Sequence, residues 1–286
     1  MPTSIAETLL AQVHAVATRL PPPRIKRLHL PARVAGDCGA APEAEFCALE
    51  LEDGAFGLSF LLLGDTLNHL LARHDGAAPL ASTDALRLAD GFASTDACAR
   101  ALGLAAINAL TQSAWRHAGY VPPAAGNSIG DIALSSADHL GMIGCFTPLV
   151  ERVLGHGARL TIVELDAAKV AAAQARFPAA HATLDRAALG DCQQIVGTST
   201  MLLNDTLDAM LAACGAAREF ALIGPSAGLW PDALFARGVT RLCGTQVIDG
   251  QALADAIASG QGWGASVRKF AIGREEWLGW KNLLAG

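Results

Sequence analysis

The sequence has few charged residues, few aromatic residues and no excess of positive charge. Charged residues make up 17% and aromatic residues 5% of its 286 positions, and 27 acidic residues outnumber 21 Lys and Arg. The basic residues are scattered along the chain, so no electrostatic footprint for nucleic acid is present. We therefore expect a small-molecule partner and no nucleic acid.

Long apolar runs and paired cysteines are also missing. No window approaches the roughly 20 consecutive apolar residues that a membrane span needs, and residues 1–20 alternate like an amphipathic helix rather than a signal peptide. The seven cysteines are odd in number and contain no C-x-x-C pair, which argues against a disulfide framework and a thiolate zinc site. The sequence therefore predicts no membrane partner and a cytoplasmic location.

The length favours two domains, at roughly 150 residues each. Three strands are expected at 24–34, 46–51 and 57–63, with a hairpin turn at 52–54, followed by helices at 67–73 and 97–114. Pro122, Pro123 and Gly126 then interrupt every periodicity. We therefore predict a small α+β domain at 1–120 and a second domain at 130–286.

In the second half, strands alternate with helices, which is typical of βαβ units and a parallel sheet. The expected strand and helix pairs are 139–143 with 146–154, 159–164 with 167–175, 192–196 with 203–213, and 219–223 with 232–237; a fifth strand at 241–243 and a helix at 251–259 follow. This pattern predicts a Rossmann-like parallel α/β domain, whose ligands bind at the carboxyl ends of its strands.

The turn after the first of these strands offers Gly141 and Gly144 for a close approach of backbone to ligand. It is not a G-x-G-x-x-G motif, yet Glu164 closes the next strand 20 residues after Gly144, where a ribose-binding acid would stand. A tight strand-to-helix turn without a ligand explains the glycines equally simply. Both interpretations stay open.

The turns after the later strands are rich in small polar groups that either cap helices or bind anions. These groups, with the glycine and proline beside them, are Thr198, Ser199, Asn204, Thr206, Gly224, Pro225, Ser226 and Asp249. Their convergence at one edge of a parallel sheet argues for a common ligand site.

No H-E-x-x-H motif or other ligand spacing marks a metal site. Cys145 is the most suggestive donor, because a thiolate at a helix N-terminus is favoured by the helix dipole. A small buried apolar residue is the alternative.

Five segments in order resemble the putative heavy-metal chelation family of bacteria and archaea. They are GLAAINAL (103–110), GMIGCFTPLVERV (141–153), VELD (163–166), GTSTMLLNDTLD (197–208) and IGPSAGLWPDALFARGV (223–239). The resemblance implies an enolase N-terminal-like domain, a Rossmann-like domain and a ligand site in the cleft between them. The residues that match its motifs include Phe146 and Pro148. Cys145 stands where the family pattern leads us to expect His or another polar residue, and Asp205 where glycine is usual.

Three hypotheses follow. The first is a binding protein or accessory enzyme of metal homeostasis, with Cys145 and Glu164 as candidate ligands of a transition metal. The second is an enzyme that uses a nucleotide-type cofactor, NAD(P) or S-adenosylmethionine, with Glu164 at a ribose. The third is a scaffold or homodimer, in which Trp263, Trp277 and Trp280 serve an interface rather than the domain's own core.

Overall fold

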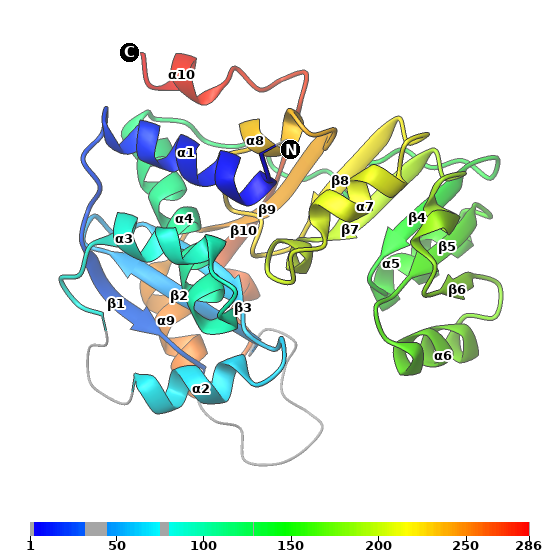
Figure 1. The fold of residues 1–286 in the computed structure, drawn as a ribbon, viewed down its shortest axis with the longest axis horizontal. Helices are drawn as coiled ribbons and strands as arrows, with labels where there is room; N and C mark the ends of the chain where they lie inside the picture. The colour runs from blue at the N-terminus through cyan, green and yellow to red at the C-terminus, as the bar shows by residue number, and fades with distance from the viewer. Residues whose placement is uncertain (1–2, 32–44, 75–79, 128, 286) are drawn as a thin grey trace.

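The computed structural model describes residues 3–31, 45–74, 80–127 and 129–285. The chain forms a three-stranded antiparallel sheet and a seven-stranded, mostly parallel sheet, with helices against both (Figure 1). This mixed α/β organisation confirms the fold class predicted from the sequence.

The small sheet consists of β1 (Ile25–His29), β2 (Phe46–Leu51) and β3 (Phe56–Phe60), in that order. The β2–β3 hairpin turns at Gly54, whose φ of 80° lies in the region that favours glycine. The strand predicted at 24–34 ends at His29, and residues 32–34 lie outside the described part. The same half of the chain contains the helices α1 (Ile5–Ala17), α2 (Thr66–Arg73) and α3 (Ala85–Ala89).

Helix α4 (Ala97–His117) is the main support of the small sheet. Almost every side chain from Cys98 to Trp115 is buried, and Gly57 of β3 lies directly against the α4 backbone. Helix α9 (Gly250–Ser259) covers the opposite face of the sheet, where Gly250 contacts Phe56. Among the described residues, no helix has the length and apolarity to cross a bilayer.

The large sheet has the strand order β10-β9-β8-β7-β4-β5-β6. Its strands are β4 (His139–Ile143), β5 (Arg159–Val163), β6 (His181–Thr183), β7 (Gln194–Thr198), β8 (Glu219–Ile223), β9 (Arg241–Val247) and β10 (Val267–Gly273). Only β10 pairs antiparallel. Counted from β4, the parallel strands follow the order 3-2-1-4-5-6 of doubly wound sheets, whose ligands bind where the order reverses. Here that point lies between β4 and β7.

The helices that connect these strands begin close to the predicted residues. They are α5 (Thr147–Gly155), α6 (Ala167–Arg176), α7 (Leu207–Ala213), α8 (Asp232–Phe235) and α9 (Gly250–Ser259); α10 (Trp280–Leu283), which was not predicted, follows β10. The helix predicted at 203–213 begins four residues later, at Leu207. A short 3₁₀ turn at residues 199–202 comes before it.

The two faces of the large sheet belong to different cores. Side chains such as Leu222 and Phe270 join the largest buried cluster, which also contains α1, α4 and the small sheet. Side chains such as Met142 and Val196 point to the other face and form a second cluster with α5. Trp277 and Trp280 are partly buried and pack against the first cluster, so both contribute to the protein's own core.

Candidate functional site

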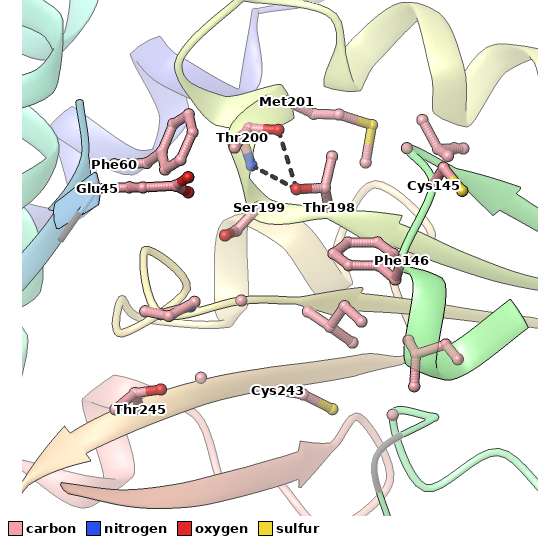
Figure 2. Close-up of a pocket in the computed structure, with 18 of the residues that line it drawn as sticks. Glu45, Phe60, Cys145, Phe146, Thr198, Ser199, Thr200, Met201, Cys243 and Thr245 are labelled. Carbon is pink, nitrogen blue, oxygen red and sulfur yellow. Dashed lines mark hydrogen bonds between the residues drawn. The ribbon is translucent and has the colours of Figure 1, made fainter. Parts of the chain in front are cut away.

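A cavity of about 810 Å³ lies at the reversal point of the large sheet and extends to the small sheet. Its walls come from the turns after β4, β5, β7 and β8 and from the strands β2 and β3 of the small sheet. Figure 2 shows these segments around the same space. The turns that follow Ile143, Val163, Thr198 and Ile223 therefore do converge, as the parallel arrangement requires.

The turn after β4 is shaped by a carboxylate from the neighbouring strand. Gly144 has a φ of 84°, and the backbone N–H of Cys145 donates to Oε1 of Glu164 over 2.7 Å. Phe146 is the N-cap residue of α5, and Pro148 lies in the first turn of that helix. Glu164 thus holds this turn in place while lining the cavity.

The surroundings of the Cys145 thiol disfavour its thiolate form. Burial, and then the negative charge of Glu164, raise the pKa of Cys145 above its ordinary value. A second cavity thiol, Cys243, is more deeply buried, and burial raises its pKa to about 12. Desolvation and a nearby carboxylate thus oppose the negative charge that the helix dipole was expected to favour at Cys145.

The turn after β7 presents hydroxyl groups to the cavity. Thr198 Oγ1 lies 2.9 Å from Thr200 Oγ1 and accepts a hydrogen bond from the Thr200 N–H over 3.2 Å. Ser199 lies between them, and Figure 2 places its hydroxyl toward the cavity. Further along, Asn204 Oδ1 accepts from the Thr206 hydroxyl over 2.7 Å.

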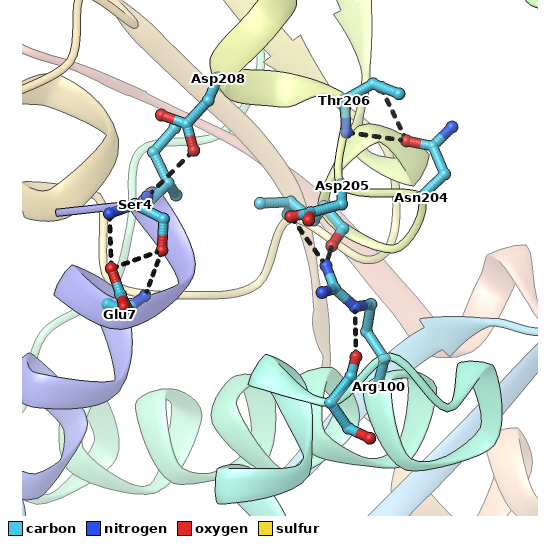
Figure 3. A network of polar contacts seen from close by, with 10 residues as sticks. Ser4, Glu7, Arg100, Asn204, Asp205, Thr206 and Asp208 are labelled. Carbon is cyan, nitrogen blue, oxygen red and sulfur yellow. Dashed lines mark hydrogen bonds and ion pairs between the residues drawn. The ribbon is translucent and has the colours of Figure 1, made fainter. Parts of the chain in front are cut away.

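An ion pair joins this turn to the α4 helix (Figure 3). Asp205 has a φ of 61°, a left-handed conformation that explains why glycine is usual at this position in the resembling pattern. Its carboxylate accepts from Nη1 of Arg100 over 3.0 Å. Arg100 is 8% exposed and also donates to the Ser94 carbonyl. The ion pair between Arg100 and Asp205 therefore connects the turn after β7 to helix α4, which belongs to the first cluster.

The turn after β8 touches both sheets. A Cβ at Gly224, whose φ is 138°, would overlap the Ser199 hydroxyl, so the close approach of these two turns requires glycine there. Ser226 Oγ accepts from the Phe60 N–H over 3.0 Å. Asn108 Nδ2 donates to the carbonyls of Leu58 and Ser226 over 2.7 and 2.9 Å.

Three predicted site residues do not line the cavity. Gly141 lies within β4, where a Cβ would overlap Ile195 and Leu189. Ser226 is fully buried and bonded to Phe60, and Asp249 caps α9 by accepting from the Ala252 N–H. We therefore leave them out of the proposed site. The predicted residues that do line it are Gly144, Cys145, Phe146, Glu164, Thr198, Ser199, Asn204, Thr206, Gly224 and Pro225.

Several cavity residues were not anticipated. They include Glu45 just before β2, Phe46 of β2, Phe60 of β3, Trp263 before β10 and Lys269 of β10. Nothing in their local sequence marks them, because only the packing of the small sheet against the strand ends brings them there. The one available signal was the cleft between two domains that the family resemblance implied.

Comparison with known proteins identifies the family. Residues 130–274 match a family model described as "Putative heavy-metal chelation", and residues 44–111 match a second model with the same description. The chain belongs to this family. A comparison with curated proteins finds no match.

Two solved structures share the fold of this chelation-family protein. Both are described as proteins of unknown function from the same family. The one from Pyrococcus horikoshii is 19% identical, with a TM-score of 0.65, over 94% of this chain and 100% of that one. The one from Desulfitobacterium hafniense is 20% identical, with a TM-score of 0.66, over 93% and 98%.

The family description implies a metal, and the described residues do not form a site for a bare ion. No group of three or more His, Cys, Asp or Glu side chains is placed to hold one among them. Cys145 and Glu164 give only two donors, the first with a raised pKa and the second already accepting a hydrogen bond. Structural metal sites in proteins use about four protein ligands and catalytic sites about three, so the predicted pair is an incomplete set.

Proposed function

We propose that this protein binds an organic molecule that chelates metal, free or as its metal complex, in the cavity between the small sheet and the reversal point of the large sheet. The observation that carries this proposal is the cavity itself. Its volume of about 810 Å³ is in the range of small-molecule sites and far larger than an ion needs. Its lining combines aromatic rings with a few hydroxyls and carboxylates, as organic ligands require.

The chemistry of the lining supports an organic ligand in a second way. Phe46, Phe60, Phe146 and Trp263 offer ring faces and edges on which a flat molecule can stack. The hydroxyls of Thr198, Ser199 and Thr200 can donate to or accept from polar groups at its edge. The family description is consistent with metal handling through such a molecule.

Thermal denaturation of protein dialysed against EDTA tests the proposal. We expect 1,10-phenanthroline, a flat aromatic chelator, to raise Tm with or without equimolar Zn²⁺, whereas Zn²⁺, Ni²⁺ or Cu²⁺ alone leaves Tm unchanged. Phe146→Ala should weaken the response, because it removes a ring from the cavity wall. Trp280→Ala, which removes a ring outside the cavity, should not. Stoichiometric uptake of a bare ion, with no response to the chelator, would overturn the proposal.

A second candidate is a Rossmann-like site for a nucleotide-type cofactor. The strand order supports it, because the cavity lies at the reversal point and Glu164 ends β5 where a ribose-binding acid would stand. The bond from Cys145 N–H to Glu164 weakens it, since that carboxylate is already partly used. Calorimetry with NAD, NADP and S-adenosylmethionine separates the two candidates. Heat from one cofactor that disappears in Glu164→Ala and persists in Glu275→Ala would favour the second.

A further inference from the structure

Glu45 contributes a carboxylate to the cavity wall. It is the last residue before β2 and is partly buried. Its carboxylate forms no hydrogen bond or ion pair with any other described residue, and desolvation raises its pKa. A carboxylate that loses water without gaining a donor is costly to the folded state, so a ligand that supplies a positive or N–H donor group would relieve that cost.

Aromatic rings surround the same part of the cavity. Phe46 lies edge to face with Phe60 at 5.4 Å between ring centroids and with Trp263 at 5.9 Å. All three line the cavity, and Figure 2 places the Glu45 carboxylate beside the Phe60 ring and facing Ser199. The faces of aromatic rings attract cations, most strongly where water is excluded.

A carboxylate beside aromatic faces matches one ligand chemistry, an organic ammonium group. A metal ion would need further oxygen, nitrogen or sulfur donors, which the rings do not supply. An anionic group would be repelled by Glu45 and would find Lys169 on α6 or Lys269 on β10 instead. Neither lysine forms an ion pair with Glu45.

We propose that Glu45, together with Phe46, Phe60 and Trp263, binds a protonated amine of the organic ligand. This inference rests on the proposed function, because it assigns a chemical class to the molecule that the cavity holds. It also gives the small sheet a role in recognition, since Glu45, Phe46 and Phe60 all belong to β2, β3 or the residue before β2.

Three indole probes that differ in one group test the inference by calorimetry at pH 8: tryptamine, neutral tryptophol and indole-3-acetate. Tryptamine should bind about tenfold more tightly than tryptophol, as a charge-assisted hydrogen bond gives, and indole-3-acetate most weakly. Glu45→Gln should bring the tryptamine and tryptophol affinities together without changing tryptophol binding. Glu45→Asp should keep part of the preference, and Glu52→Gln, at an exposed glutamate beyond the other end of β2, should keep all of it.

The outcomes separate this inference from the proposed function. If tryptophol binds but Glu45→Gln leaves the preference for tryptamine intact, or if indole-3-acetate binds most tightly, the amine assignment is wrong and the organic ligand site stands. If none of the indoles and no phenanthroline binds to protein whose circular dichroism is native, the proposed function itself fails and the assignment fails with it.

Discussion

The two faces of the large sheet differ in what supports them. One face shares its core with α1, α4 and the small sheet, whereas the other packs against α5 and the segment around Ile129 and Ile132. The first face is therefore built from segments distant in sequence, and the second largely from neighbouring βα units. The cavity lies where the two meet, so its walls should differ in how readily they open.

Gly57→Ala should have the largest effect on this arrangement. A Cβ at Gly57 would overlap the Ala105 carbonyl and the Ala109 N–H of α4, and neither backbone atom can move without shifting the helix. We expect the free energy of unfolding in urea to fall by about 4 kcal/mol or more. Gly155→Ala is the matched control, because no atom lies within 4 Å of its Cβ. It should be neutral or stabilising by up to about 1 kcal/mol, and equal losses would mean that β3 and α4 do not pack this way.

A pair of leucine truncations compares the two faces directly. Leu104 in α4 and Leu140 in β4 are both fully buried, in the first and second clusters respectively. Each Leu→Ala change should cost about 2–5 kcal/mol. Hydrogen exchange should separate them, with faster exchange in both sheets for Leu104→Ala and mainly in β4, β5 and α5 for Leu140→Ala. Equal loss of protection in β1–β3 would show that the faces unfold as one unit.

The ion pair between Arg100 and Asp205 can be separated from the backbone conformation at residue 205. Asp205→Ala removes the pair and leaves a side chain that disfavours a φ of 61°, so it should lower the free energy of unfolding by about 1–2 kcal/mol. Asp205→Gly also removes the pair but adopts the left-handed conformation without a Cβ penalty, so it should cost less than about 1 kcal/mol. If glycine is no better than alanine in thermal melts, the left-handed conformation at this turn is wrong.

The smallest expected effect concerns the charge of Glu45. Because burial raises its pKa above its ordinary value of 4.5, the folded state holds the proton more tightly than the unfolded state. Its ionisation therefore reduces stability as pH rises through the folded pKa. Glu45→Gln should be more stable than the native protein at pH 7, by less than about 1 kcal/mol, with no gain below pH 4.5. A gain in Glu45→Gln that is the same at every pH would point to a cause other than charge.

The βα units were predictable from the sequence. Strands β4 and β8 begin and end at the predicted residues, because buried parallel strands are continuous apolar runs between glycine turns. Strand β6 was missed since it has only three residues. Strand β10 was missed since Arg268 and Lys269 interrupt its apolar pattern.

The candidate site was predictable only where topology decides it. Turns after adjacent parallel strands must meet, so Gly144, Glu164 and Thr198 could be grouped before any coordinates. Glu45 and Trp263 could not, because their place depends on how the small sheet packs against the strand ends. The predicted metal pair of Cys145 and Glu164 was incomplete for a related reason, since donor geometry is a property of the fold and not of spacing.

One buried amide has a consequence for binding. Asn108 donates to β3 and to the turn after β8, and that turn accepts from Phe60, so opposite walls of the cavity are tied together through a single side chain of α4. Such a brace keeps the cavity preorganised, and a ligand entering it would lose little free energy to ordering the walls. This construction favours fast association of a ligand, because no conformational change of the protein has to precede or follow the encounter.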